Sequence, residues 1–527
     1  MISIQQVSCR IAPQLTLSVD QLAIRPGEHW CLFGTNGSGT SLLAALIAGR
    51  LIAGRQGVHY GLGFNPRDDL VEVSFAEQQR LWEYDNRHDI SDYDPAAVDA
   101  GTTVRALVSG NNVSGNNVGG NNVSGDNASP EHQPDLESLL TELGIIDFVD
   151  QGIRYLSSGQ MRRAMLARTL YRNPRVMMLD NPLEGIDRDS AHTIVAALQR
   201  WMTSDNVLLL LARRQRAIVP GLSHMALMQE QAREVNGRWL RQLRLVSAGT
   251  LPNVISSATF AALTEPAGKV PRQLPPPCAG REPPVPDPAV PLIDLAGVNV
   301  GYGDRLLLRN FHWQMRVGDH VLIEGPNGCG KSTLLALISG ESHKAYGQPV
   351  TLFGRRRGSG ESVWQVKSRF GVVSNDLHQH YIKGWRVLDV VVSGFFDSLG
   401  LYDDSGSSEH NCARDWLRVV QLEDAQRAWY HELSFGQQRL VLLARAMVKH
   451  PAILILDEPC TGLDDYHCRL LLALLDRIAL EGRTHIMFVS HTEGDVPTCI
   501  NRYLSFDGEG GIEVGECGSD DLGGAPT

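Results

Sequence analysis

The feature that most constrains this chain is an internal repeat, in which two long segments recur in the same order. RPGEHWCLFGTNGSGTSLLAALIAG at 25–49 is similar to RVGDHVLIEGPNGCGKSTLLALISG at 316–340. LSSGQMRRAMLARTLYRNPRVMMLDNPLEGID at 156–187 is similar to LSFGQQRLVLLARAMVKHPAILILDEPCTGLD at 433–464. Such self-similarity indicates that the chain contains two copies of one folding unit.

Each copy has the pattern of an α/β domain. An apolar strand, a glycine-rich loop and a helix come first, and a second helix, another apolar strand and an acidic turn follow much later. Continuous apolar runs such as AILILD are typical of strands buried on both faces of a parallel sheet that helices cover. We therefore predict two α/β domains, each built on a mostly parallel sheet.

Two segments of biased composition interrupt the globular pattern of the sequence. Residues 264–291 are rich in proline and predict a semi-rigid extended linker. Residues 109–127 repeat Asn, Val, Ser and Gly, which bury too little apolar surface to fold alone. We expect a first domain at 1–263 that carries this flexible insertion, a second domain at 292–513, and a flexible tail at 514–527.

Composition excludes several classes of protein. The net charge of −11 argues against nucleic acid as the main partner, since a phosphate backbone demands a basic surface. No apolar run approaches the roughly 18 residues of a membrane helix, and the N-terminus lacks a secretory pattern, so we expect a cytoplasmic protein. The nine cysteines lack a C-x-x-C pair, which favours reduced thiols over disulfides or a metal site. Arg355–Arg357 are interpreted as a solvated hairpin.

The second copy contains a complete phosphate-binding pattern, GPNGCGKST, between an apolar strand and a helix. Its glycines permit a tight backbone that directs N–H groups at phosphate oxygens, and the helix that follows points its positive end at the same anion. Lys331 can reach the β- and γ-phosphates, and Ser332 can hold Mg²⁺. The predicted nucleotide loop comprises Gly325, Pro326, Asn327, Gly328, Cys329, Gly330, Lys331, Ser332 and Thr333.

Polar residues at strand ends supply the remaining chemistry of the second copy. Asp457 ends the strand AILILD, where it can hold Mg²⁺, and Glu458 can orient and deprotonate an attacking water. His491 follows the strand HIMFVS and could reach the γ-phosphate. We therefore expect Glu458, His491 and Lys331 to be catalytic. Tyr302 could stack on adenine, although a single tyrosine is more often a core residue.

The motif L-S-x-G-Q occurs in both copies, as LSSGQ at 156–160 and LSFGQ at 433–437. With the phosphate loop and the acidic strand, in this order and twice, the chain resembles the ATP-binding cassette (ABC) ATPases over nearly its whole length. The resemblance implies two P-loop nucleotide-binding domains of ABC type, each with a helical subdomain, that hydrolyse ATP with Mg²⁺. It also implies an intramolecular pseudo-dimer, in which each nucleotide contacts the phosphate loop of one domain and the signature motif of the other.

The resemblance implies one further metal contact. The family usually has a glutamine after the strand that follows the phosphate loop, where it contacts Mg²⁺ or water. Asn375 stands there in the second copy, so the implied metal ligands are Ser332, Asp457 and Asn375. Gln78 and Gln79 are both candidates in the first copy.

The first copy has lost the residues that carry the chemistry. Thr40 replaces the lysine, Asn181 the glutamate and Arg213 the histidine, and Ile11 stands at the position of Tyr302. A charge-assisted phosphate contact contributes about 1.5–3 kcal/mol, so nucleotide binding should weaken roughly tenfold to a hundredfold. An amide cannot accept a proton, which removes a general-base contribution of about 10²–10⁴ in rate.

The family's head-to-tail arrangement then implies two unequal sites. The competent site combines the second copy's loop and carboxylates with Ser157, Ser158, Gly159 and Gln160. The degenerate site comprises Gly34, Gly37, Gly39, Thr40, Ser41, Asp180, Asn181, Ser434, Gly436 and Gln437.

The second half carries a narrower resemblance. Residues 293–507 are similar to a branch of tandem cytosolic family members associated with molybdate transport, which implies a separate membrane permease and a location at the cytoplasmic face of the inner membrane. Two alternatives stay open. One is a ribosome-associated tandem ABC protein, although that class usually has a charged helical linker that the proline-rich 264–291 disfavours. The other is a nucleotide sensor or regulator that is not coupled to transport.

Overall fold

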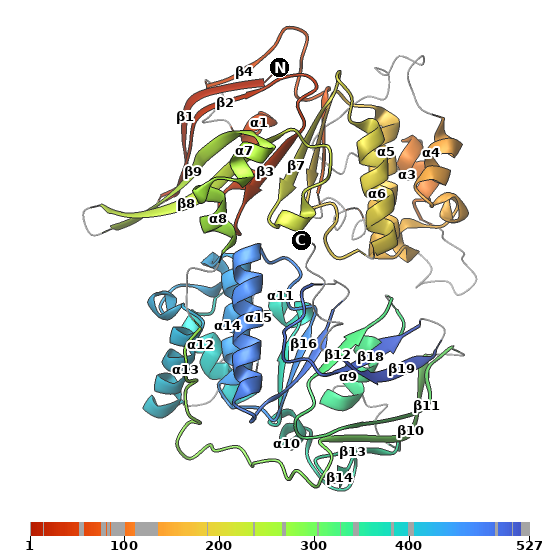
Figure 1. The fold of residues 1–527 in the computed structure, drawn as a ribbon, viewed down its shortest axis with the longest axis vertical. Coiled ribbons are helices and arrows are strands. Elements are labelled where there is room, and N and C mark those ends of the chain that lie inside the picture. The colour runs from red at the N-terminus through yellow and green to blue at the C-terminus, as the bar shows by residue number, and fades with distance from the viewer. Residues whose placement is uncertain are drawn as a thin grey trace. The chain divides into compact units, whose positions relative to one another are not determined.

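The computed structural model divides the chain into two units, Met1–Glu265 and Pro266–Thr527. Figure 1 shows the helices and strands of both units. The structure describes residues 2–13, 15–51, 57–74, 81, 85, 101–110, 135–186, 188–235, 238–265, 270–302, 305–326, 328–340, 347–380, 384–398, 405–490, 494–507 and 510–517.

The first unit contains a nine-stranded sheet in the order β4-β1-β2-β9-β8-β3-β7-β6-β5. The five strands from β8 to β5 run parallel, and β9 joins them to the antiparallel strands β1, β2 and β4. The strands are β1 (Ile2–Ala12), β2 (Leu15–Ile24), β3 (Trp30–Gly34), β4 (Val58–Tyr60), β5 (Leu70–Val73), β6 (Val176–Asp180), β7 (Val207–Ala212), β8 (His224–Val235) and β9 (Arg238–Thr250). The helices are α1 (Thr40–Ile47), α3 (Val104–Ser109), α4 (Leu136–Glu142), α5 (Ser158–Arg172), α6 (Arg188–Trp201), α7 (Leu251–Ile255) and α8 (Ala258–Thr264).

The second unit has two sheets where the first unit has one. A six-stranded sheet has the order β15-β16-β17-β12-β18-β19, and a four-stranded antiparallel sheet has the order β11-β10-β13-β14. The strands are β10 (Ile293–Tyr302), β11 (Arg305–Met315), β12 (Val321–Glu324), β13 (Val350–Leu352), β14 (Arg355–Arg356), β15 (Phe370–Val373), β16 (Ile453–Asp457), β17 (His485–Val489), β18 (Arg502–Phe506) and β19 (Ile512–Glu516). The helices are α9 (Lys331–Ser339), α10 (Val363–Lys367), α11 (Asn375–His380), α12 (Val387–Val392), α13 (Ser407–Val419), α14 (Phe435–Met447) and α15 (Asp465–Leu480).

The structure confirms the mostly parallel sheet of each unit and a helical group beside it. Helices α3, α4 and α5 group together in the first unit, and α12, α13 and α14 do so in the second (Figure 1). In β16, Ile453 and Ile455 face one apolar cluster while Leu454 and Leu456 face another, and all four are buried. Burial on both faces is the physical reason why these strands are continuous apolar runs.

The two copies also share strand register, which supports the alignment of their motifs. Trp30 pairs with Leu209 in the first unit, and the corresponding pair in the second unit is Val321 with Met487. A histidine before each of these strands accepts a backbone N–H of the neighbouring strand: His29 from Leu208, and His320 from Ile486, both at 3.1 Å. The strand register therefore supports the sequence alignment in which Arg213 corresponds to His491.

The structure corrects the predicted boundaries. Thr264, assigned to the linker, is the buried last residue of α8, and residues 514–516, assigned to the tail, belong to β19. Ser109, assigned to the insertion, ends α3 with Gly110 as its C-cap, and residues 111–127 lie outside the described part. Arg357, assigned to a solvated hairpin, is buried and forms an ion pair with Glu361 at 3.4 Å.

The described part of the linker, 270–291, contains no helix and packs against the second unit. The buried Cys278 thiol lies 3.2 Å from the Ser408 hydroxyl of α13. Arg281 binds Glu409 at 3.0 Å and lies over the rings of Phe395 and Phe396. These contacts attach the segment to the second unit, and the semi-rigid extended linker stays a prediction.

No helix in the described ranges is long and apolar enough to cross a membrane. All nine cysteines are described, and none of them forms a disulfide.

Candidate nucleotide-binding site

The phosphate loop of the second unit connects β12 to α9, and its backbone requires glycine. Gly325 has φ +133°, and a Cβ there would lie 2.6 Å from the carbonyl oxygen of Phe506. Gly330 is the N-cap of α9 at φ +114° and offers no side chain to cap the helix. The N–H groups of the first turn therefore stay available to an anion, which is the geometry that binds phosphate.

Lys331, the first residue of α9, is buried at 7% exposure and its side chain turns back over the loop. Its ammonium donates to the carbonyl oxygens of Gly325 and Pro326, both at 2.8 Å. Burial lowers the pKa of this lysine, while Cys329, Glu458 and Asp457 act in the opposite direction. These carbonyl acceptors are neutral, so the ammonium can exchange them for the charged oxygens of a bound phosphate.

The two acidic residues lie next to this loop, at the end of β16. Asp457 is the last residue of the strand, and both it and Glu458 interact electrostatically with Lys331. Glu458 has the positive φ of +47°, and its N–H donates to the carbonyl of Val489 on β17 at 3.1 Å. This contact fixes a backbone conformation that is unfavourable for glutamate.

Arg439 is a site residue that the sequence analysis missed. It lies on α14 and is fully buried at 0% exposure, and burial lowers its pKa. The guanidinium donates to the carbonyl of Ser374 at 3.0 Å and to Oδ1 of Asn375. The amide oxygen that the sequence offered to Mg²⁺ therefore already accepts one hydrogen bond. A usable signal was present, because an arginine stands two positions after L-S-x-G-Q in both copies.

Each signature motif is an N-terminal capping box. In the first unit the Ser157 hydroxyl accepts the N–H of Gln160, and the Gln160 side chain accepts the N–H of Ser157, at 3.2 and 2.8 Å. Ser434 and Gln437 form the same pair in the second unit. Reciprocal bonds of this kind stabilise the start of a helix. Ser157 is nevertheless exposed, so its hydroxyl is accessible to a ligand.

The first unit keeps the backbone of this site with other residues at the positions of Lys331 and Glu458. Gly39 is the N-cap of α1 at φ +94°, and Thr40 is the first helical residue, as Lys331 is in α9. Asn181 follows β6 with φ +46°, and its N–H donates to the carbonyl of Leu211 on β7 at 3.1 Å. The turn is thus the same as the one at Glu458, with an amide in place of the carboxylate.

Side-chain nitrogens of Asn181 and Arg213 lie near the carboxylate of Asp180 in the first unit. Asn181 donates to this carboxylate through Nδ2, and the guanidinium of Arg213 lies 3.9 Å from the same oxygen. Arg213 also lies 3.7 Å from Glu184. A cation of the chain itself therefore stands beside the acidic residue that the sequence analysis associated with this site.

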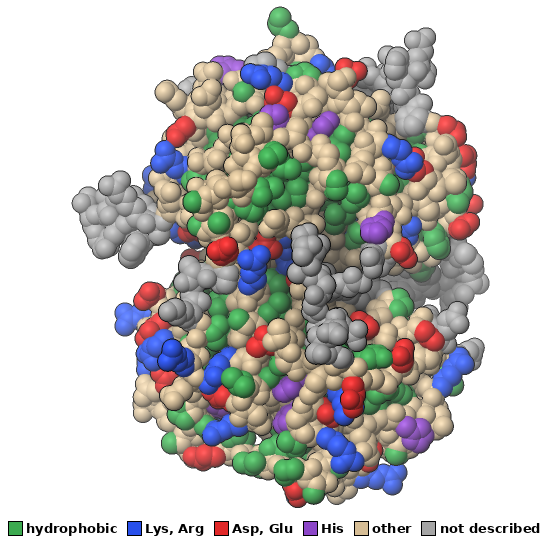
Figure 2. Space-filling model, in the orientation of Figure 1, with side chains coloured by type: hydrophobic (Ala, Val, Ile, Leu, Met, Phe, Trp, Pro, Cys, Tyr) green, Lys and Arg blue, Asp and Glu red, His purple; other side chains and the backbone are tan. Residues whose placement is uncertain are grey.

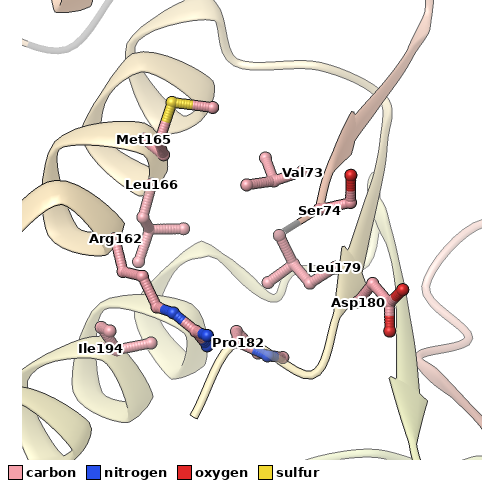
Figure 3. A pocket seen from close by; sticks show the side chains of 9 residues that line it. All are labelled: Val73, Ser74, Arg162, Met165, Leu166, Leu179, Asp180, Pro182 and Ile194. Carbon is pink, nitrogen blue, oxygen red and sulfur yellow. The ribbon is translucent and has the colours of Figure 1, made fainter. Parts of the chain in front are cut away.

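Arg162 occupies in the first unit the position of Arg439, and one of its contacts is with the turn after β6. Its guanidinium donates to the carbonyl of Asn181 at 2.8 Å, and burial lowers its pKa. Figure 3 shows this side chain reaching from α5 to the turn at Pro182, along the edge of a pocket with a mainly apolar wall. The pocket is lined by Val73, Ser74, Arg162, Met165, Leu166, Leu179, Asp180, Pro182 and Ile194.

Some predicted site residues lie outside what the structure describes. They are His491, Asn327, Gln78 and Gln79, together with the side chains of Ser158 and Tyr302. The roles assigned to them stay predictions.

The sequence matches the family described as ABC transporter twice, over residues 17–184 and 308–461. The chain belongs to the ABC transporter family. Both matches begin before a phosphate loop and end in the turn after the acidic strand, so each unit contains one ATP-binding domain. As a tandem ABC protein, the chain is an ATPase.

Two relatives and two solved structures extend over most of the chain. The ABC transporter ATP-binding protein ModF of Escherichia coli K12 is 32% identical over 521 residues, which cover 97% of this chain and 98% of the relative. An uncharacterized ABC transporter ATP-binding protein of Saccharomyces cerevisiae, YDR061W, is 26% identical, over 72% of this chain and 73% of its own. The tandem ABC resemblance found in the sequence is thereby confirmed.

Among solved structures, the RNase-L inhibitor matches with a TM-score of 0.56 at 14% identity, over 97% of this chain and 90% of its own. A complex of an archaeal ribosomal stalk protein with the ribosome recycling factor aABCE1 matches with a TM-score of 0.55 at 15% identity, over 97% and 89%. At these identities the likeness shows the fold alone.

Proposed function

We propose that the protein hydrolyses ATP mainly at one site, which combines the phosphate loop and carboxylates of the second unit with the signature motif of the first. The observation that carries this proposal is the pair of matching turns after β6 and β16. Both have a positive φ and the same backbone hydrogen bond, but one presents Asn181 and the other Glu458. The fold is thus retained where the base is lost.

The geometry supports a defined role for each residue of the second unit. The N–H groups at the start of α9 bind phosphate oxygens, and Lys331 exchanges its carbonyl acceptors for them. Glu458 orients the attacking water and removes its proton. Carboxylate, hydroxyl and amide oxygens are the ligands that Mg²⁺ prefers, so Asp457, Ser332 and Asn375 fit the metal. Mg²⁺ neutralises charge on the transferred phosphoryl group.

The composite nature of the site is supported by the exposed Ser157 at the start of α5. A signature kept beside a defective phosphate loop has no use in its own unit, but it can complete the intact site of the other. The same argument makes Ser434 the partner of the degenerate site, in which Thr40 and Asn181 leave slow or no hydrolysis.

We propose that ATP hydrolysis drives transport by a separate membrane permease, whose cargo is an oxyanion such as molybdate. The support is the sequence resemblance of residues 293–507 to family members associated with molybdate transport and the similarity to ModF over nearly the whole chain. This role places the protein at the cytoplasmic face of the inner membrane. A ribosome-associated role has less support, because residues 270–291 contain no charged helix. Figure 2 shows acidic and basic side chains interspersed on the visible face, without the basic field that nucleic acid requires.

The catalytic assignment is tested by replacing the base. Glu458→Gln should lower the steady-state rate of ATP hydrolysis by about 10²–10⁴, because the amide cannot accept a proton. The matched control is Asn181→Glu, which restores the carboxylate beside Thr40 and should leave turnover within about twofold. A Glu458→Gln protein that kept most of its activity would show that another group is the base.

The composite site is tested by adding a negative charge to each signature serine. Aspartate is a good N-cap, so Ser157→Asp and Ser434→Asp should both keep their helices. Ser157→Asp should nearly abolish hydrolysis through repulsion of the nucleotide phosphates, whereas Ser434→Asp should not. Equal effects of the two changes would contradict a shared nucleotide.

The transport role is tested by isolating the protein from its own cells with its partners. Recovery of a membrane permease would support it, and sedimentation with ribosomes would support the alternative. Recovery of neither would favour a regulator that is not coupled to transport.

A further inference from the structure

Two thiols and a carboxylate converge in the second unit, directly after the catalytic turn. Cys460 lies two residues after Glu458, Cys468 lies in α15, and Asp495 lies between β17 and β18. One ligand atom from each, the two Sγ atoms and a carboxylate oxygen, all lie within 4.8 Å of one another. The three residues are buried, with exposed fractions of 7%, 3% and 8% respectively.

We propose that this cluster binds a thiophilic divalent cation such as Zn²⁺, with water as the fourth ligand. Zinc is bound tetrahedrally by cysteine sulfur at about 2.3 Å and by carboxylate oxygen at about 2.0–2.2 Å, which requires ligand atoms about 3.5–3.8 Å apart. A contraction of about 1 Å from the observed limit brings the three atoms to these separations. The proposal therefore requires that rotation of the three side chains, with small shifts of the turn that carries Cys460, closes this distance when the metal binds.

The surroundings reduce the cost of placing thiolates here. The guanidinium of Arg439 interacts electrostatically with Cys460 as well as with Asp457 and Glu458. Two thiolates and one carboxylate exceed the charge of a divalent cation by one, and a nearby arginine offsets that excess. Arg439 therefore connects the metal cluster to the catalytic carboxylates through a single fully buried charge.

The first unit supplies an internal comparison. In the aligned repeats, Leu183 stands at the position of Cys460 and Ala191 at the position of Cys468. Both thiols are thus confined to the unit that keeps its lysine and glutamate. The sequence analysis favoured reduced thiols over a metal site because no C-x-x-C occurs. The cluster escapes that criterion, since its ligands come from a turn, a helix and a distant loop.

The site is tested with Co²⁺, which replaces Zn²⁺ in tetrahedral thiolate sites and reports on its own ligands. The full chain, reduced with a thiol-free reductant and free of nucleotide, should bind one equivalent with a thiolate charge-transfer band and intense visible absorption. Excess Zn²⁺ should remove both bands. Absence of a thiolate band would overturn the proposal, and so would a spectrum typical of oxygen ligands alone.

Single replacements assign the ligands. Cys460→Ser, Cys468→Ser and Asp495→Asn should each weaken Zn²⁺ binding at least tenfold. The matched control is Cys499→Ser, because Cys499 pairs with the carboxylate of Asp476 but is no part of the cluster. Thermal unfolding without metal identifies any replacement that fails to fold, and Asp495→Asn then carries the test. Unchanged binding in folded variants would place the metal elsewhere.

A consequence for catalysis follows, and it rests on the proposed function. Contraction of the cluster displaces the turn that also carries Glu458, and a misplacement of about 1 Å can cost about 10²-fold in rate. Zn²⁺ should therefore inhibit ATP hydrolysis, and Cys468→Ser should abolish this inhibition without changing the uninhibited rate. The Co²⁺ spectrum needs no nucleotide, so an inactive protein with the expected spectrum would refute the proposed function and leave the metal site intact.

Discussion

Arg439→Met offers a sharp test of how the second unit holds its catalytic centre. Methionine fills much of the space of the arginine side chain but removes its charge and its donors. The two lost hydrogen bonds, to Ser374 and Asn375, come from a charged donor and contribute about 1.5–3 kcal/mol each. Relief of the desolvation of a fully buried guanidinium offsets part of that loss. The expected net decrease in the free energy of unfolding is about 1–3 kcal/mol.

The effect on catalysis should exceed the effect on folding. Without Arg439 the amide of Asn375 loses the bond that orients it, and loss of one such contact in the transition state lowers turnover about 10- to 100-fold. Steady-state ATP hydrolysis and urea unfolding of the same preparation separate the two effects. Arg162→Met is the matched control, because Arg162 binds the carbonyl of Asn181 in the degenerate site. A folded Arg439→Met protein with full turnover, or an equal loss in Arg162→Met, would refute the reasoning.

Three further predictions address other parts of the structure. Thr40→Lys should raise the number of nucleotides bound per chain, measured with a labelled analogue, while turnover changes less than about twofold. Gly436→Ala should destabilise the second unit by about 1–3 kcal/mol, seen as a lower Tm, since the new Cβ would lie 2.4 Å from the ring of His467, which Asp464 holds in place at 2.8 Å. Burial lowers the pKa of His320 to about 4, so the unfolded state takes up a proton between about pH 6.5 and 4 and the native state does not. The stability of the second unit should therefore fall as pH drops through that window, and the urea midpoint should fall less steeply in His320→Asn.

Much of the fold could be predicted because the two copies of the repeat can be aligned with each other. The apolar runs that become β6 and β16 are buried along most of their length, which accounts for their composition. The glycine-rich loops at Gly34 and Gly325 could also be predicted, because these glycines occupy conformations or spaces that other residues cannot.

The remaining features depend on contacts between distant segments, for which the sequence has no local pattern. Arg439 reaches Asn375 only because α14 packs against the end of β15, and Cys278 is buried only because α13 offers it a surface. The proline-rich composition of 270–291 correctly excluded a helix, yet it could not indicate which unit the segment packs against. The cluster of Cys460, Cys468 and Asp495 could not be predicted either, because its residues come from separate segments of the chain.

The matching turns after β6 and β16 also differ in what they demand of their residues. Asparagine enters the left-handed region several times more readily than most residues, whereas glutamate is strained there. In the first unit this turn therefore has a residue that tolerates the left-handed conformation, and in the second unit it has a residue that is strained in it. Replacement of Asn181 by glutamate would therefore introduce backbone strain at the turn after β6, and the first unit would need other contacts to compensate for it.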